Sequence, residues 1–318
     1  MLKYTLKRIL LLIPTIIGIS LFIFLAMEAA SGDFVSTLIT EEMTDEEVHA
    51  LRASYGLDKP VLERYVDYMW TLLHGDLGTS YTSRMPVMEL FMQKIGNTTM
   101  LAVASTIVCI LISIPLGIFA ARHRGSIFDN ISNVLGVLGL SIPNFWLGLM
   151  LIVWFSVQRS WLPPGGNDDG ILSVILPAIT VGTGHTAILM RTTRSAMLDT
   201  LRQDYLRTAR AKGVSERKVI NVHALRNAMI PILSVALTQF AGCFGGAALT
   251  ETVFGWPGVG KMVVDAVKQR DIPLACGTLI MKCIIISLIG LATDLLYVVV
   301  DPRVKTQFAS AKRGKRNG

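Results

Sequence analysis

Six long apolar stretches, separated by segments that carry most of the charged residues, divide this chain. An α-helix needs about 20 mostly apolar residues to cross about 30 Å of hydrocarbon, because each residue adds about 1.5 Å. We therefore predict an all-α integral membrane protein with six transmembrane helices. The predicted spans cover residues 9–29, 101–121, 131–157, 172–190, 232–254 and 277–300.

The composition supports a membrane protein and excludes several other classes. Hydrophobic residues make up 52% of the 318 residues and charged residues only 17%, whereas soluble proteins carry roughly 25% charged residues. A disordered chain has the opposite balance, and four cysteines are too few for a disulfide scaffold. The net charge of +7 is explained by basic residues kept on the cytoplasmic side of a membrane, so it does not indicate nucleic-acid binding.

Three of the predicted spans have unusual features. Lys3, Lys7 and Arg8 precede the first, as in a signal peptide, but its apolar run is longer than 7–15 residues and no small-x-small cleavage site follows, which favours an uncleaved anchor. Pro143 predicts a kink in the third, because proline removes an intrahelical donor. The fourth gives the weakest helix signal, since it holds Pro177, Gly182, Gly184 and His185.

The distribution of basic residues predicts the orientation. Residues 191–231 hold nine Lys or Arg residues against three acidic ones, which places this segment in the cytoplasm. With six spans, both termini then lie in the cytoplasm. Residues 31–97 are acidic and face the outside. The nine bases are Arg191, Arg194, Arg202, Arg207, Arg210, Lys212, Arg217, Lys218 and Arg226.

The outside segment has the signals of a small helical cap. Thr44 and Glu47 have the spacing of a capping box, and Gly56 can end the helix that they begin. Pro60 begins a second helix that Gly75 ends. Shielding of the outer rim and docking or gating of a partner are equally compatible with this cap. Its predicted apolar stripe is Leu62, Tyr65, Val66, Met69 and Leu73.

The basic cytoplasmic segment predicts two short helices. Apolar residues recur at helical spacing, Gly213 supplies a C-terminal stop, and Ser215 can cap a following helix. Such a basic amphipathic helix can lie on anionic lipid. Alternatively, its small residues allow it to insert into a soluble partner as a rigid protrusion. The recurring positions are Leu198, Leu201, Tyr205, Leu206 and Ala209.

The sequence contains no convincing catalytic, nucleotide or metal site. Residues 255–262 almost match a phosphate-binding GxxxxGK[ST] loop, but Met262 stands where Ser or Thr would bind magnesium. The glycines there are better explained by a tight turn or re-entrant segment. The five histidines lack metal-ligand spacing, and no nucleophilic or paired-carboxylate arrangement is recognisable. We therefore expect no enzyme activity and no cofactor bound by this chain.

Ionisable and polar residues within the spans are candidates for function, because a charge at mid-bilayer costs roughly 2.5–3.5 kcal/mol on insertion scales. Asp294 is expected to face protein, with packing against another subunit favoured over a water-filled path. Lys282 is predicted to reach the outer membrane surface. Asn144, beside the predicted kink, is a candidate for lining a translocation path.

Several separated motifs occur in order along the chain. The central motif is Tyr205-Leu206-Arg207-Thr208-Ala209-Arg210-Ala211-Lys212-Gly213, with His223-Ala224-Leu225-Arg226-Asn227-Ala228 after it. The others include Gly75-Asp76-Leu77-Gly78, Ser141-Ile142-Pro143-Asn144-Phe145-Trp146, Leu249-Thr250-Glu251-Thr252-Val253-Phe254 and Asp301-Pro302-Arg303. Together these motifs resemble ABC importer permeases of the dipeptide/oligopeptide/nickel group. Arg207-Thr208-Ala209 stands where the wider importer pattern has Glu-Ala-Ala, which fits the peptide branch better than the sugar or amino-acid branches.

The resemblance implies an inner-membrane permease subunit that forms half of a path for di- or oligopeptides, with nickel, a metal chelate or an opine as the alternative cargo. It implies a second permease, two cytoplasmic ATPase subunits that hold ATP and Mg, and an extracytoplasmic solute-binding protein. Residues 205–213 would couple to the ATPase and drive alternating access. A self-sufficient secondary transporter or channel is the rival class, but no inverted repeat is recognisable.

This interpretation divides the chain into three parts. Residues 1–98 hold the anchor helix and the outer cap. Residues 99–303 form the permease core, with the coupling loop at 191–231. Residues 304–318 form a basic cytoplasmic tail.

Overall fold

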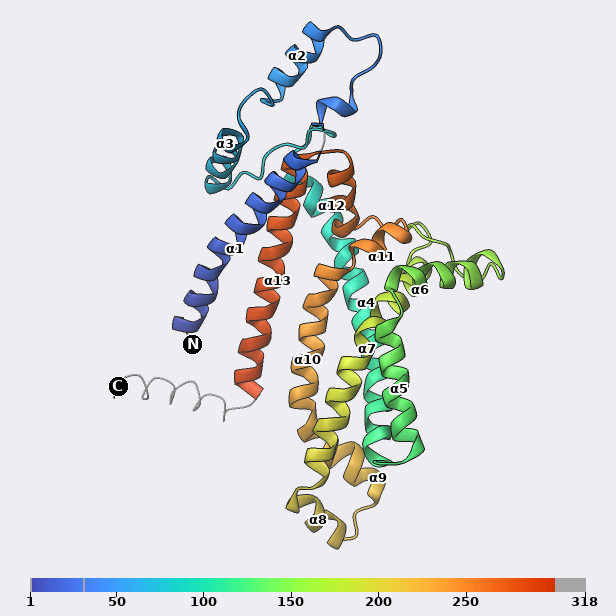
Figure 1. Cartoon of the computed structure of the whole chain (residues 1–318). Helices are drawn as coiled ribbons and strands as arrows, with labels where there is room; N and C mark the ends of the chain where they lie inside the picture. Colours follow the sequence, from blue (N-terminus) through green and yellow to red (C-terminus); the bar gives the residue numbers. More distant parts are fainter. Residues whose placement is uncertain (1, 31, 301–318) are drawn as a thin grey trace. The chain divides into compact units, whose positions relative to one another are not determined.

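The computed structural model describes residues 2–30 and 32–300, and these fold almost entirely as helices (Figure 1). Short segments of other helix types are η1 (Val35–Thr37), η2 (Ile152–Val157) and η3 (Val219–Ala224). The α-helices are α1 (Leu2–Ala29), α2 (Asp45–Ser54), α3 (Val61–Leu73), α4 (Val87–Arg122), α5 (Ile127–Ser141), α6 (Asn144–Leu151), α7 (Ile171–Leu201), α8 (Asp204–Ala211), α9 (Glu216–Lys218), α10 (Leu225–Gly246), α11 (Ala248–Val253), α12 (Val259–Lys268) and α13 (Ile272–Val300).

Within the described ranges, five helices are long and apolar enough to cross a membrane. Each overlaps one predicted span, so the first, second, fourth, fifth and sixth predictions are confirmed as long apolar helices. The five run over Thr5–Ala29, Val87–Arg122, Ile171–Leu201, Glu216–Gly246 and Ile272–Leu295.

The third predicted span is interrupted rather than kinked. α5 ends at Ser141, and α6 begins at Asn144 with Pro143 at its N-cap. Ile142 has an extended backbone with ψ 120°, because a residue before proline avoids the helical region. Asn144–Val157 is an apolar helix of its own that is shorter than the five spans.

The fifth predicted span also ends earlier than expected. α10 stops at Gly246, and Ala248–Val253 form the separate helix α11. Consecutive glycines at 245 and 246 weaken the helix at this point, since glycine costs about 1 kcal/mol relative to alanine.

The fourth predicted span is a continuous helix of 31 residues despite its glycines. Gly182 lies so close to α4 that a Cβ there would be 2.7 Å from the Ser105 carbonyl oxygen. Gly117 of α4 lies equally close to α7, since its Cβ would be 2.8 Å from the Met190 carbonyl oxygen. These glycines therefore permit close helix packing, as is common in membrane proteins.

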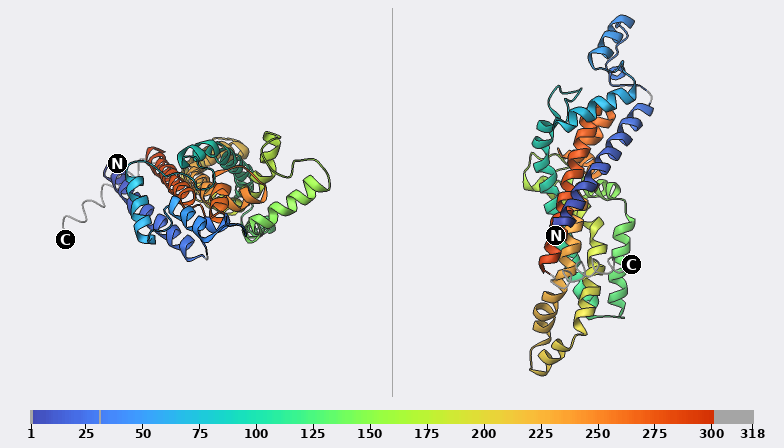
Figure 2. Two further views of the ribbon diagram at one scale, coloured as in Figure 1. Left: turned by 90° about the horizontal axis from the view of Figure 1, so that it is seen from above. Right: turned by 90° about the vertical axis from the view of Figure 1, so that its left-hand side faces the viewer.

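The chain forms two compact units. Among the described residues, the first comprises 2–30, 32–100, 165–167 and 244–287, and the second comprises 101–164, 168–243 and 288–300. In the second unit, α8 lies at the shared end of α7 and α10, as two perpendicular views show (Figures 1 and 2).

The segment between α1 and α4 contains the two predicted cap helices. Thr44 and Glu47 form the predicted capping box at the start of α2, and Pro60 stands at the N-cap of α3. The predicted stripe of α3 is only partly correct. Tyr65 and Met69 pack against the core of the first unit. The other three members, Leu62, Val66 and Leu73, are exposed, because the buried face is centred on Tyr68 instead.

Candidate functional site

The motif predicted to couple to a partner forms α8 and the turn that follows it. α8 covers Asp204–Ala211, and Gly213 then takes a φ of +79°, as predicted for a C-terminal stop. The second predicted short helix is not separate, since α9, η3 and α10 run on as one apolar helix over Glu216–Gly246. Ser215 is the N-cap residue of α9, but its side chain makes no capping hydrogen bond.

Leu206 anchors α8 to the second unit. Its side chain is fully buried and shares one hydrophobic cluster with Leu189 and Met197 of α7 and with Val219 and Ile232 of the following helical run. The rest of the predicted stripe is less buried. Leu198, Leu201 and Ala209 pack at the edge of this cluster, whereas Tyr205 is 43% exposed.

Two polar contacts hold α8 against the helix that follows it. The Arg210 guanidinium donates two hydrogen bonds to the Glu216 carboxylate, of 3.0 Å from Nε and 2.9 Å from Nη2. These bonds lower the pKa of Glu216. The Asn227 Nδ2 donates to the Tyr205 hydroxyl at 2.7 Å. These contacts attach α8 to the helical run that follows it, and Leu206 also attaches it to α7.

The remaining face of α8 is open and basic. Arg207 is 80% exposed and pairs only loosely with Asp204, at 3.8 Å. Such exposed pairs contribute little to stability. We call Arg207, Thr208, Ala211, Lys212 and Gly213 the exposed α8 surface, since all five are exposed. This surface combines positive charge with small residues that allow a close approach.

Asn144, the candidate path-lining residue, lies against α7 in the second unit. It is the first residue of α6, and a Cβ at Gly184 of α7 would lie 2.9 Å from its Oδ1. Nearby on α7, the His185 carbonyl accepts a hydrogen bond of 3.4 Å from Gln239 of α10. The side chain of Asn144 thus lies against a polar part of α7, and its role in a path stays a prediction.

The two charged residues of α13 lie in different surroundings. Asp294 is half-buried, and its predicted role at a subunit interface or path is untested. Lys282 is only 6% exposed, so the prediction that it reaches the membrane surface is wrong. Its ammonium instead interacts electrostatically with Glu251, which offsets the cost of burying a charge.

The sequence interpretation missed Glu251 as an organising residue. Its side chain is fully buried, and its carboxylate accepts hydrogen bonds of 2.8 Å from the Thr98 hydroxyl and from the Lys261 backbone N–H. The Val259 N–H donates in turn to the Thr98 hydroxyl at 2.8 Å. The signal in the sequence was that Glu251 is an acidic residue within an otherwise apolar predicted span.

The glycines at 258 and 260 surround this carboxylate. A Cβ at Gly258 would collide with the Glu251 carboxyl group, and one at Gly260 would lie 2.8 Å from its Oε2. Residues 255–258 therefore form a turn, one of the two predicted alternatives, and residues 259–262 begin α12. The turn and the start of α12 enclose an internal carboxyl group rather than a phosphate. Trp256 strengthens it by donating from Nε1 to the Asn97 carbonyl at 3.0 Å.

The chain belongs to the family of binding-protein-dependent transport system inner membrane components. The model of this family matches residues 113–306, and a second model, for the N-terminal part of such membrane components, matches residues 1–102. The protein is therefore a multi-pass inner-membrane permease that works with other components of an ABC transport system. It is a transport component and not a catalytic subunit.

Named relatives align over nearly the whole chain. The dipeptide transport system permease protein DppB of Escherichia coli (strain K12) is 41% identical, covering 96% of this chain and 99% of that protein. The oligopeptide transport system permease protein AppB of Bacillus subtilis (strain 168) is 38% identical, covering 96% and 100%. The glutathione transport system permease protein GsiC of Escherichia coli O6:H1 is 37% identical over 96% of this chain and 99% of its own length.

A solved structure shares the fold. An inward-facing structure of the MetNI methionine ABC transporter superposes with a TM-score of 0.58 at 18% identity, covering 67% of this chain and 97% of that chain. At this identity the match concerns the fold alone, and it confirms an ABC transporter membrane fold for the larger part of the molecule.

Proposed function

We propose that this permease forms half of the translocation path of an ATP-driven importer for di- and oligopeptides. The observation that carries this proposal is the identity of 41% to a dipeptide permease over 96% of the chain. Relatives named for oligopeptides and glutathione support the same class of cargo. Peptides are thus favoured over nickel, a metal chelate or an opine.

The coupling element in this proposal is the exposed α8 surface. It would contact a cytoplasmic ATPase subunit, and residues 205–213 would move when the ATPase pair closes on ATP. Because Leu206 and the Arg210–Glu216 pair fix α8 to α7 and α10, a push on the surface is passed to two long helices. These helices would then rock between inward-open and outward-open states.

The remaining subunits follow from this arrangement. A second permease completes the path, two ATPase subunits hold ATP and Mg, and an extracytoplasmic solute-binding protein delivers the peptide. The segment with α2 and α3 is a candidate for receiving that binding protein. Asn144 and Asp294 are the residues of this chain that we assign to the path or to the interface with the second permease.

Both termini and α8 lie in the cytoplasm in the proposed orientation, and α2 lies outside. A cysteine introduced at Glu46 should therefore react with a thiol reagent that cannot cross the membrane, whereas one at Lys212 should react only after the membrane is opened. Both positions are exposed, so burial does not confuse the comparison. The reverse labelling pattern would overturn the orientation.

Reconstitution into proteoliposomes tests the proposed function. With the companion permease, the ATPase subunits and the binding protein present, we expect uptake of a labelled dipeptide that requires ATP and no uptake of nickel. If a proton gradient drives uptake without any ATPase subunit, the chain is a self-sufficient secondary transporter. ATP-driven uptake of nickel alone would contradict the peptide assignment.

A further inference from the structure

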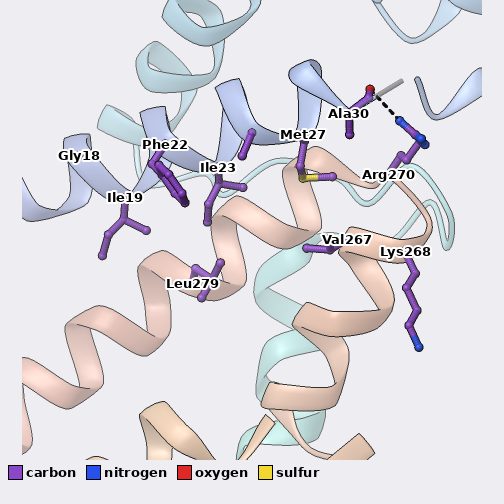
Figure 3. A pocket seen from close by; sticks show the side chains of 11 residues that line it. Gly18, Ile19, Phe22, Ile23, Met27, Ala30, Val267, Lys268, Arg270 and Leu279 are labelled. Carbon is purple, nitrogen blue, oxygen red and sulfur yellow. Dashed lines mark hydrogen bonds between the residues drawn. The ribbon is translucent and has the colours of Figure 1, made fainter. Parts of the chain in front are cut away.

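A cavity of about 690 Å³ lies in the first unit beside α1. Its walls come from one face of α1, from Leu279 of α13 and from the segment that ends α12 (Figure 3). Ile19 and Ile23 point from α1 toward α13, and Leu279 points back toward α1. We call this cavity the α1–α13 groove.

The walls of the groove are apolar and have little protein cover. Only 11% of the most apolar 18-residue stretch of α1 is buried by the rest of the protein. Phe22, which lines the groove, is 72% exposed. Both α1 and α13 are long enough to cross a membrane. An apolar groove between two such helices faces hydrocarbon, so an apolar chain is the occupant that its walls favour.

One end of the groove is basic. Arg270 and Lys268 belong to its lining. Among the residues that the structure describes, no acidic residue lines the groove. The Arg270 Nη1 donates to the carbonyls of Ala30, at 3.1 Å, and Gly32, which fixes the guanidinium at this end. Both bonds use the same nitrogen, and a guanidinium has five N–H donors, so donors remain for an anion. Lys268 is exposed and extends along α12, from where it adds longer-range attraction (Figure 3).

We propose that the α1–α13 groove binds an anionic phospholipid. One acyl chain lies along Ile19, Ile23 and Leu279, and the phosphate lies at Arg270. A charge at one end of an otherwise apolar groove matches an amphiphile with one anionic head, and its volume lies within the range of roughly 300–1,000 Å³ that is usual for ligand sites. A helix of another subunit fits less well, since helix contacts in membranes rely on close packing rather than open volume.

Gly18 provides a test that removes no contact. It lines the groove, and nothing lies within 4 Å of a Cβ built there, so Gly18→Leu adds a side chain to the groove at a position that is open around the Cβ. Gly96 of α4 is the matched control, because its Cβ also meets open space and it does not line the groove. The full-length chain is placed in bilayers that contain a phosphatidylglycerol with a photoreactive acyl chain, and the labelled peptides are mapped.

We expect labelling at α1 and at Leu279, a loss of about tenfold in Gly18→Leu, equivalent to about 1.4 kcal/mol of binding, and wild-type labelling in Gly96→Leu. Unchanged labelling in Gly18→Leu would overturn the proposal.

The head group is tested by competition. Unlabelled phosphatidylglycerol should displace the probe better than phosphatidylcholine, and Arg270→Gln should remove this preference. Lys59→Gln, the same loss of charge outside the groove, should keep it. Equal competition by the two lipids in the wild-type chain would contradict an anionic ligand. If the assembled transporter shows no labelling and α1 instead crosslinks to the companion permease, the groove is a protein interface and the proposal is wrong.

Discussion

Leu206 and Glu251 are both fully buried, but they organise their surroundings by different forces. Leu206 contributes apolar packing at the end of a bundle, where its loss leaves a cavity. Glu251 contributes a charged acceptor that gathers a hydroxyl and a backbone N–H around it. A substitution of Leu206 is therefore expected to loosen α8 alone, whereas a substitution of Glu251 is expected to disturb a hydrogen-bond network.

Leu206→Ala should release α8 from the cluster with Leu189 and Met197. Truncating a buried leucine costs about 2–5 kcal/mol in well-packed cores. We expect lower thermal stability in detergent and faster proteolysis near Lys212. Leu62→Ala is the control, since Leu62 is 68% exposed and its truncation should cost less than about 0.5 kcal/mol. Equal effects of the two changes would show that Leu206 does not anchor α8.

Glu251→Gln should lower thermal stability and uptake together. A glutamine amide would direct an NH₂ group at either the Thr98 hydroxyl or the Lys261 N–H, and it would leave Lys282 without its anionic partner. A buried polar group without a partner costs about 1–3 kcal/mol, and more for a charge. Replacing Lys282 by Met in the same chain should restore part of the lost stability. A wild-type melting temperature in Glu251→Gln would contradict this network.

At the scale of elements, the C-terminal end of α8 depends on an ion pair and on the turn that follows it. The Arg210–Glu216 pair fixes one side, and the pKa of Glu216 is lowered by this pairing. A lowered carboxyl pKa contributes stability above the ordinary value near 4.5, and this contribution is lost as the pH falls through the lowered pKa.

Proteolysis near Lys212 should accordingly increase as the pH falls below about 4.5. The pair is partly exposed, so its contribution is no more than about 1 kcal/mol. Glu216→Gln should show faster cleavage already at neutral pH and a smaller pH dependence. The same pH dependence in the wild-type chain and in Glu216→Gln would rule out this pair as its source.

The position of α8 also depends on the backbone turn at Gly213. Its φ of +79° costs about 1–2 kcal/mol for a residue with a Cβ, and least for asparagine. Open space surrounds the position, so this cost arises from the backbone alone. We expect Gly213→Val to reduce transport per ATP hydrolysed and Gly213→Asn to retain most of it. Equal coupling in both variants would show that the turn conformation does not matter.

Some elements were predictable because their signals are local. The capping box of α2, the start of α3 and the stop at Gly213 depend on a few neighbouring residues, and all three are confirmed. A kink was predicted at Pro143 and a continuous helix was predicted through residues 245–254, but the structure has a break at both places. Proline and paired glycines mark these places in the sequence, but such residues can bend a helix or end it, and packing decides between the two. The position of Lys282 was mispredicted because its partner, Glu251, is distant in sequence and was not recognised.

At the scale of the whole molecule, the sequence indicated the class through the order of its motifs, and the family match confirms that class. Long apolar helices require a membrane, whereas a working path requires other subunits. The molecule supplies helices, an internally tied α8 and a basic surface that faces outward from the bundle. These features suit a part that is moved by a partner rather than one that drives transport alone.

The most direct test of this account measures ATP hydrolysis and dipeptide uptake in the same proteoliposomes for Ala211→Trp. Ala211 lies on the exposed α8 surface, so a bulky side chain disturbs a partner contact while leaving the Leu206 anchor intact. Val222→Trp, at an exposed position of η3, is the control. The account predicts continued ATP hydrolysis with strongly reduced uptake in Ala211→Trp and normal uptake in the control. Normal uptake per ATP in Ala211→Trp would contradict it.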